Sequence, residues 1–194
     1  MKMRPYKMKA RAETERATGE AILAAALAAF SRDTFDRVTL QSIADASGVT
    51  VQTVIRRFGS KENLFAMLAE RETARVLASR EAPDGSDLSA ALETLIDHYE
   101  TDGEMVLNFV RQEHMFGPIR TIVEQGRRIH REWVERHCRE ILSGTRGERR
   151  ARLLNAAIAA TDLGTWKLLR RDLGLERSEV LAVMNELLHG LRRK

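Results

Sequence analysis

Residues 39–64 read TLQSIADASGVTVQTVIRRFGSKENL and decide the fold of the chain around them. The first part has one apolar helical face, because apolar residues recur at i, i+3 and i+4: Leu40, Ile43 and Ala44. Gly48 follows, where a helix end needs a left-handed cap or room for a sharp turn. Thr50 suits an N-cap, since its hydroxyl can accept a hydrogen bond from a free backbone N–H. The stretch predicts two short helices joined by a tight turn.

The second of these helices has an apolar side and a polar side. Val54, Ile55 and Phe58 form the predicted inner stripe, and Gly59-Ser60 ends the helix and caps the next one. A helix-turn-helix of this kind places its second helix in a DNA major groove. The alternative is an ordinary helical hairpin with a solvated second face. The side chains that we expect at bases or phosphates are Thr39, Thr50, Val51, Gln52, Thr53, Arg56, Arg57 and Lys61.

This part of the chain resembles the DNA-binding domain of the TetR family of bacterial transcriptional regulators over residues about 14–66. Ile55 departs from the family, which usually has a Tyr there that touches a phosphate, and Thr34 stands where the family usually has Gly. The resemblance implies a homodimer paired through its last two helices and a small-molecule site among the middle helices. The matching residues are Ala21, Ile22, Leu23, Ala26, Leu27, Phe30, Thr39, Ile43, Ala44, Ser47, Gly48, Val49, Thr50, Thr53, Val54, Phe58, Ser60, Lys61, Glu62, Asn63 and Leu64.

The distribution of charge agrees with DNA binding by the N-terminal third. Of the net charge of +4, residues 1–64 carry all the excess, with 11 Lys and Arg against 7 Asp and Glu. Residues 65–194 have 21 of each kind. Residues 1–13 are basic and show no helical stripe, so we expect an N-terminal arm that either reaches DNA or only solubilises the chain.

Composition places the chain among soluble helical proteins. It has 194 residues, of which 43% are hydrophobic and 31% charged, so it can bury a core. Cys138 is the single cysteine, which fits a reducing cytoplasm. The N-terminus lacks the apolar run of a signal peptide, and no stretch approaches the roughly 18 apolar residues of a membrane span. We therefore expect a cytoplasmic protein with no membrane partner.

Helical periodicity without strand alternation predicts an all-α fold of about nine helices. The expected organisation is a basic arm at 1–13, a helix-turn-helix domain at 14–66, and a helical ligand-binding and dimerisation domain at 67–194. The pattern predicts a first helix at 14–31, a break at 81–86, an interruption at Asp102-Gly103, and later helices at 105–115, 118–142, 148–172 and from Ser178.

The last two helices favour pairing with a second subunit. Small residues recur there at helical spacing and would let another helix approach closely, and the final helix has a broad apolar arc. The alternative is an internal core pair. The expected dimer residues are Ala157, Ala160, Gly164, Val180, Met184 and Leu187.

The middle helices supply an apolar set with a few polar groups, which is the composition of a ligand pocket and also that of a core. The candidate residues for a largely apolar small molecule are Met67, Leu95, Tyr99, Met105, Phe109, Met115, Phe116, Ile122, Gly126, His130, Trp133 and His137.

Catalytic and metal chemistry finds little support. His130 and His137 lie on one helical face but about 10 Å apart along the axis, too far for one metal ion. There is no GxGxxG, Walker or HExxH motif. We expect no cofactor, no metal and no enzyme. The leading hypothesis is a dimeric repressor that binds a palindromic DNA operator and is released by a small molecule. The alternative is a helical binding protein or enzyme on the same scaffold that does not bind DNA, which the loss of Tyr at position 55 favours.

Overall fold

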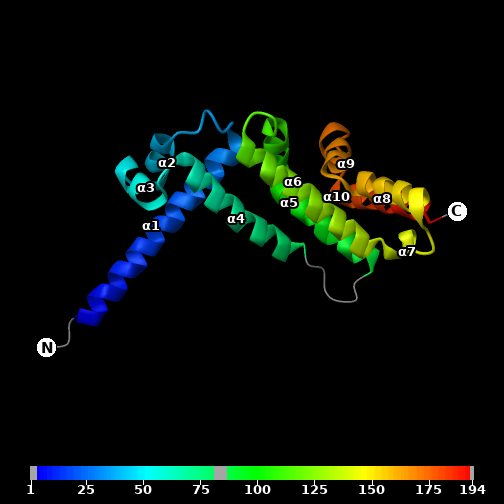
Figure 1. The fold of residues 1–194 in the computed structure, drawn as a ribbon, viewed down its shortest axis with the longest axis horizontal. Helices are drawn as coiled ribbons and strands as arrows, with labels where there is room; N and C mark the ends of the chain where they lie inside the picture. The colour runs from blue at the N-terminus through cyan, green and yellow to red at the C-terminus, as the bar shows by residue number, and fades with distance from the viewer. Residues whose placement is uncertain (1–3, 81–86, 193–194) are drawn as a thin grey trace.

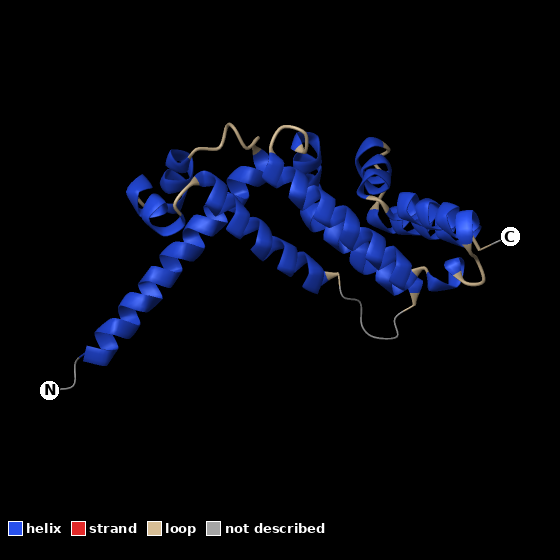
Figure 2. Cartoon of the chain, viewed as in Figure 1, coloured by secondary structure: helices blue, strands red, loops and turns tan. Residues whose placement is uncertain are grey.

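The computed structural model describes residues 4–80 and 87–192, with side chains from Arg11 onward. These residues are helical without a strand, so the all-α prediction is confirmed for them (Figures 1 and 2). The elements are α1 (Arg4–Arg32), α2 (Leu40–Ser47), α3 (Val51–Phe58), α4 (Lys61–Ser79), α5 (Leu88–Gln112), α6 (Gly117–His137), α7 (Arg139–Leu142), α8 (Gly147–Thr161), α9 (Leu163–Lys167), a π-helical turn η1 (Leu168–Asp172) and α10 (Arg177–Gly190).

Two hydrophobic cores organise these helices. The N-terminal core joins α1–α4 and also takes Ile119 and Val123 from α6. The C-terminal core joins α5, α6 and α8–α10 around Trp166 and Met184, both fully buried. The helix-turn-helix therefore shares its core with the helices that follow it.

The first helix is longer than the sequence pattern predicted. We expected it to begin at residue 14, whereas α1 begins at Arg4 and its N-terminal part projects from the body of the molecule (Figure 1). Pro5 lies in the first turn, where its missing N–H removes no helical hydrogen bond. No other Pro follows within α1, and Ala, Lys, Arg, Met and Glu, which are good helix formers, predominate.

The predicted interruption at Asp102-Gly103 is wrong, because α5 runs unbroken from Leu88 to Gln112. Gly103 has a packing role instead: a Cβ there would lie 2.7 Å from a ring carbon of Trp166. Asp102 is held by His98 within α5 and by Arg75 of α4. A residue pair that resembles a turn in the sequence is therefore a contact point within a helix.

Three other helix boundaries also differ from the prediction. The helix expected at 118–142 ends at His137, since Cys138 has a ψ of 24°. The helix expected at 148–172 breaks at Asp162, which has an extended ψ of 151° and caps α9 through a 2.7 Å bond from the Gly164 N–H to its carboxylate. The last helix is capped by Glu176 rather than Ser178. The first two breaks, at Cys138 and Asp162, fall at single residues with helix on both sides, so periodicity alone could not locate them.

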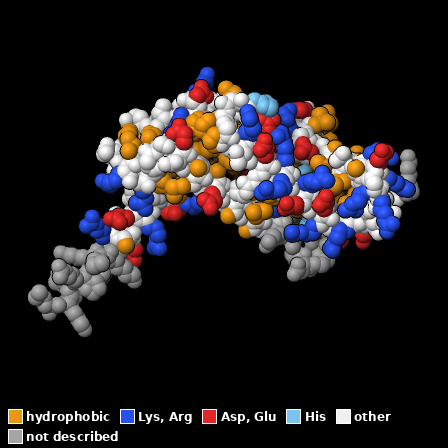
Figure 3. Space-filling view, viewed as in Figure 1, with side chains coloured by type: hydrophobic (Ala, Val, Ile, Leu, Met, Phe, Trp, Pro, Cys, Tyr) orange, Lys and Arg blue, Asp and Glu red, His pale blue; other side chains and the backbone are white. Residues whose placement is uncertain are grey.

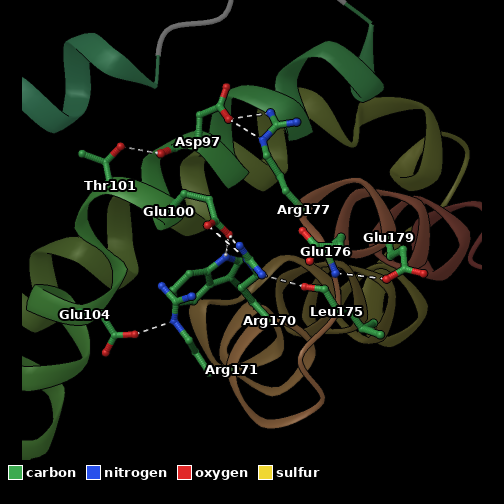
Figure 4. A network of polar contacts seen from close by, with 11 residues as sticks. Asp97, Glu100, Thr101, Glu104, Arg170, Arg171, Leu175, Glu176, Arg177 and Glu179 are labelled. Carbon is green, nitrogen blue, oxygen red and sulfur yellow. Dashed lines mark hydrogen bonds and ion pairs between the residues drawn. The ribbon is translucent and has the colours of Figure 1, made fainter.

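A row of ion pairs fixes the segment after α9 against α5. Asp97, Glu100 and Glu104 point from α5 toward three arginines of η1 and α10 (Figure 4). The paired atoms lie 2.8 Å apart for Asp97 with Arg177, 3.0 Å for Glu100 with Arg170, and 2.7 Å for Glu104 with Arg171. Side chains of both charges intermingle over this part of the surface (Figure 3).

We predict that Gly103→Ala lowers the free energy of unfolding by about 1–3 kcal/mol, because the added methyl group must displace Trp166 from a filled core. Denaturant unfolding measures the change. The control is Gly126→Ala, another helical position with open space around its Cβ, which should be neutral or stabilising by up to about 1 kcal/mol. Equal effects of the two substitutions would contradict the packing role of Gly103.

Candidate functional site

The helix-turn-helix is built by capping interactions that the sequence specifies. Thr39 forms a capping box with Ser42 at the start of α2, and Gly48 ends α2 in the left-handed region with a φ of 69°. Thr50 then caps α3 by accepting from the Thr53 N–H at 3.2 Å. These contacts fix the angle between α2 and α3 through local backbone hydrogen bonds.

The outer face of α3 is open to solvent. Gln52 and Arg56 are exposed, and Val51 and Thr53 are half-buried. Ile55 does not join the inner stripe as predicted, because its side chain is 40% exposed. Val54 and Phe58 are buried and hold α3 on the N-terminal core. This leaves a helix face with amide, hydroxyl and guanidinium groups, the groups that read base edges and phosphates.

Arg57 and Lys61 have packing contacts that set them apart from Arg56. Arg57 lies across α1, where a Cβ on Gly19 would fall 2.6 Å from its guanidinium nitrogen. Lys61 points inward: its ammonium donates to the carbonyl oxygens of Phe35 at 2.7 Å and Val38 at 2.9 Å. It also lies 4.3 Å from the centre of the Phe35 ring. We therefore correct the expectation for Lys61, whose charge stabilises the loop before α2 rather than facing outward.

The middle helices enclose a cavity of about 340 Å³ lined by α4, α5, α6, α8 and α9. Its wall is mainly apolar, and the polar side chains of Arg80, Tyr99 and His130 lie close together in it, at what we call its polar end. Half of the twelve residues predicted for a ligand line it: Tyr99, Met105, Phe109, Ile122, Gly126 and His130.

The other six predicted ligand residues do not line the cavity. Met67 and Met115 are 52% and 71% exposed, and Leu95 and Trp133 belong to the C-terminal core. Phe116 stacks on Phe35, with the ring centres 3.8 Å apart, inside the N-terminal core. His137 packs against Trp133, with ring centres at 4.9 Å. Helical spacing identifies an inward face, but it does not distinguish a side chain at a void from one in contact with a neighbour.

A buried chain of hydrogen bonds lies at the polar end of the cavity. Arg80 Nη2 is 3.2 Å from His130 Nδ1, and His130 Nε2 is 3.2 Å from the Thr161 hydroxyl. That hydroxyl donates to the Ala157 carbonyl at 2.8 Å, and the Tyr99 hydroxyl donates to the Thr161 carbonyl at 3.0 Å. Arg80 was missed in the sequence because it immediately precedes the predicted break and resembles a surface residue there.

The protonation of His130 follows from this chain. Burial, followed by the nearby Arg80 charge, lowers its pKa to about 4. The ring is therefore neutral at pH 7. Nδ1 accepts from the guanidinium, which places the proton on Nε2, from where it is donated to Thr161. Burial likewise raises the pKa of the Tyr99 hydroxyl, so it stays protonated.

A second polar network joins α4 and α5 beside the cavity. Burial raises the pKa of Asp102, but hydrogen bonds from His98 and Arg75 outweigh this and leave it lowered. Arg75 reaches Asp102 and Glu72 at 2.6 Å each. Glu72 and Asp102 are thus already paired with Arg75 of α4.

The residues predicted for dimerisation fall into two groups. Ala157, Val180 and Met184 are fully buried within the C-terminal core of one chain, and Ala160 is 8% exposed. They cannot reach a partner, and this expectation is corrected: small and apolar residues at helical spacing pack α8 against α10 internally. Gly164 and Leu187 are exposed, Leu187 to 46%. Leu168 and Leu173, which the pattern did not single out, are 50% and 61% exposed.

The described residues contain neither a metal-binding cluster nor a membrane-spanning helix. In 4–80 and 87–192, no three His, Cys, Asp or Glu side chains are grouped to hold a metal ion. No helix in the same ranges is long and apolar enough to cross a membrane. Cys138 is buried, which raises its pKa to about 11 and keeps it a thiol.

Comparison with known proteins agrees with this architecture. Residues 22–68 match the family of bacterial regulatory proteins described as the tetR family, so the resemblance of the helix-turn-helix segment is confirmed. No curated protein sequence matches significantly. The whole chain has the fold of TetR-family transcriptional regulators.

Three solved structures illustrate the likeness. A tetR-family transcriptional regulator from Streptomyces coelicolor aligns with a TM-score of 0.68 at 19% identity, over 92% of this chain and 79% of that one. A TetR-like regulator from Rhodococcus sp. RHA1 aligns with a TM-score of 0.67 at 22% identity, over 91% and 97%. A regulator described as putative from Saccharomonospora viridis, in complex with choline, aligns with a TM-score of 0.68 at 17% identity, over 92% and 96%.

We predict that His130 makes the protein less stable in mild acid. As pH falls below 6.5 the unfolded chain protonates this histidine, whereas the folded chain resists until about pH 4, so stability is lost between these values. The loss at pH 5 should be on the order of 1–2 kcal/mol. Unfolding of wild type and His130→Gln from pH 4 to 7.5 measures it, and the variant should show a flatter profile. His114→Gln, at an exposed histidine, is the control. Parallel profiles for wild type and His130→Gln would contradict this assignment.

Proposed function

We propose that the protein is a transcriptional repressor that binds a palindromic operator as a homodimer and releases it when a small molecule enters the cavity. One observation carries this proposal. The helix α4 begins in the helix-turn-helix core, with Leu64 and Phe65 buried, and its later turns line the cavity through Glu72, Val76 and Arg80. A ligand that shifts α4 therefore acts on the element that positions α3.

The proposed DNA contacts come from the open face of α3. Gln52, Thr53 and Arg56 would approach bases or phosphates, with Thr39 and Thr50 at the helix N-termini near the backbone. Ile55 supplies no phosphate contact, so Arg56 carries more of the charge interaction. In a dimer, two such helices about 34–36 Å apart would read half-sites one turn apart. The coupling needed for release is of order 1–3 kcal/mol.

A small-molecule effector is supported by the enclosed cavity. The similar protein from Saccharomonospora viridis was solved with choline, so a protein of this fold holds a small organic molecule. We infer no enzymatic step here, since the cavity presents an apolar wall and a neutral histidine bound on both ring nitrogens. Ile55 favours one competing function, a binding protein that has lost DNA recognition.

We predict that Arg56→Ala weakens binding to DNA from the protein's own upstream region by about tenfold, because a phosphate contact is lost. The slope of log affinity against log salt should also fall by about one for each protomer. Fluorescence anisotropy between 50 and 300 mM salt, roughly the range where such slopes are measured, gives both values.

Two variants serve as controls for Arg56→Ala. Arg128→Ala removes an exposed arginine on α6, far from α3, and should leave DNA affinity unchanged. Lys61→Met should lower the unfolding free energy, because Phe35 and Val38 lose their donor. The repressor proposal fails if folded dimer gives no specific DNA binding at low salt; retained ligand binding would then favour the competing function.

The proposed dimer interface is the outer surface of α8 and α10. Leu187 is 46% exposed on α10, and Leu181 and Val183 of the same helix are half-buried. A solvent-facing apolar side on the last helix is typical of a surface that pairs with a second copy.

We predict that Leu187→Glu shifts the protein from dimer to monomer, because it places a charge in an apolar interface. Light scattering after size-exclusion chromatography measures the mass. Met67→Glu is the matched control, since Met67 is also about half exposed (52%) but lies on α4. A dimer that persists in Leu187→Glu at micromolar concentration contradicts this interface.

A further inference from the structure

Arg80 is a buried cation without an anionic partner among the described residues. Only 8% of the residue is exposed, and its Nε is buried without a hydrogen-bond partner. Its guanidinium contacts are with neutral groups: Nη2 lies 3.2 Å from the His130 ring nitrogen, and the Tyr99 side chain also interacts with it, with the ring centre 5.9 Å away. The Nε of Arg80 therefore remains an unused donor at the cavity wall.

Other arginines near the cavity are paired, which sets Arg80 apart. Arg75 is bound to Asp102 at 2.6 Å, and Arg127 to Glu113 at 2.7 Å. Arg75 and Arg127 are thus each neutralised by a carboxylate. A buried guanidinium without such a partner costs stability, because burial removes water from a permanent charge.

The acidic groups around the cavity do not neutralise Arg80. Glu72 is bound to Arg75. Asp162 also lines the cavity, but it is exposed, and its carboxylate accepts from the Gly164 N–H rather than from Arg80. Among the described residues, the Arg80 charge therefore has no paired carboxylate.

We propose that the effector is an organic monoanion, with a carboxylate that pairs with Arg80 and an apolar body that fills the rest of the cavity. This rests on the proposed function, since it names the ligand class of that same site. The Arg80 Nε has no partner among the described residues, and a guanidinium edge matches a carboxylate, which can accept two parallel hydrogen bonds. One uncompensated charge suits a monoanion, whereas a phosphate dianion would need a second cation. The mainly apolar wall and the volume of about 340 Å³ suit a medium-sized aliphatic or aromatic acid.

The pairing would act directly on α4. Arg80 is the C-cap residue of this helix, and its backbone N–H bonds the carbonyls of Val76 and Leu77. A carboxylate that draws the guanidinium would move the last turn of α4 relative to α6, where His130 now holds it.

The test uses three probes of equal chain length that differ in the head group: octanoate, 1-octanol and octylamine, which is an ammonium ion at pH 7. Thermal shift and isothermal titration on the full chain measure binding. Octanoate should bind wild type most tightly and octylamine most weakly. Arg80→Met should lower octanoate affinity about tenfold or more and leave 1-octanol unchanged. Hexanoate and decanoate cover the range of ligand length.

Two further variants keep the result interpretable. Arg80→Lys retains the charge without the planar fork and should keep part of the octanoate preference. Arg128→Met, an exposed arginine on α6, should change nothing. Ligand-free Arg80→Met should be at least as heat-stable as wild type, because it removes an unpaired buried charge; a purely structural Arg80 would give a less stable variant. If Arg80→Met does not fold, wild type and Arg80→Lys still test the head-group order.

The inference is overturned if no carboxylate of the series binds in an Arg80-dependent way, or if 1-octanol or octylamine binds wild type as tightly as octanoate. Its failure is separable from failure of the repressor proposal. Loss of operator binding with an intact octanoate preference rejects the repressor alone. Specific operator binding that responds to a neutral or cationic compound, without preference for the carboxylate, rejects only the ligand class.

Discussion

The helix α4 is held at its two ends by the half-buried Lys61 and the buried Arg80, and the link between the two functional regions depends on this constraint. At its start, the Lys61 ammonium bonds two carbonyl oxygens of the loop before α2. At its end, the Arg80 guanidinium enters the cavity and bonds His130 of α6. The helix between them, Lys61–Ser79, spans about 28 Å at 1.5 Å per residue. Because α4 is a continuous helix, a displacement of its last turn at Arg80 would move its first turn at Lys61 as well.

The second connection between the two regions does not involve α4. Asn108 of α5 donates to the carbonyls of Phe30 and Asp33 at 3.1 Å each, where the end of α1 leaves backbone acceptors unsatisfied. Gln112 accepts from the Phe35 N–H at 2.8 Å, and Phe35 stacks on Phe116. This contact fixes one point of the helix-turn-helix domain on α5. Ile119 and Val123 of α6 also pack in the N-terminal core. In the proposed repressor, a shift of α4 against these contacts would reorient α2 and α3 and so change the spacing of two recognition helices in a dimer.

Capping residues in the sequence predicted the local structure better than the spacing of apolar residues predicted the contacts between helices. Thr39, Gly48 and Thr50 form the predicted caps, because each acts on backbone groups within a few residues of itself. Predictions of which group a side chain contacts in the folded protein were less accurate. Lys61 and Arg56 look equivalent in the sequence, yet one bonds the loop carbonyls and the other faces solvent. Ala157 and Met184 have the spacing of an interface, but α8 and α10 use it to pack on each other. Arg80 could not be identified from the sequence, because its interest lies in the lack of a carboxylate partner among residues 4–80 and 87–192, and such a lack leaves no sequence pattern.

The cavity also touches α8, one of the two helices proposed for dimerisation. A ligand there would therefore contact both the helix that leads to the DNA-binding region and a helix of the proposed dimer interface. Ile158 of α8 lines the cavity, and the Thr161 hydroxyl at the end of that helix is bonded by His130. His130 therefore lies between Arg80 of α4 and Thr161 of α8, and it is neutral, so it can pass on a change of position without a change of charge. A ligand that drew the guanidinium away from His130 would free a ring acceptor and loosen α4 from α6, while α8 would keep its contact. In the proposed repressor, the DNA-binding side would then move while the proposed dimer helices stay in place, so that the operator could be released without dissociation of the dimer.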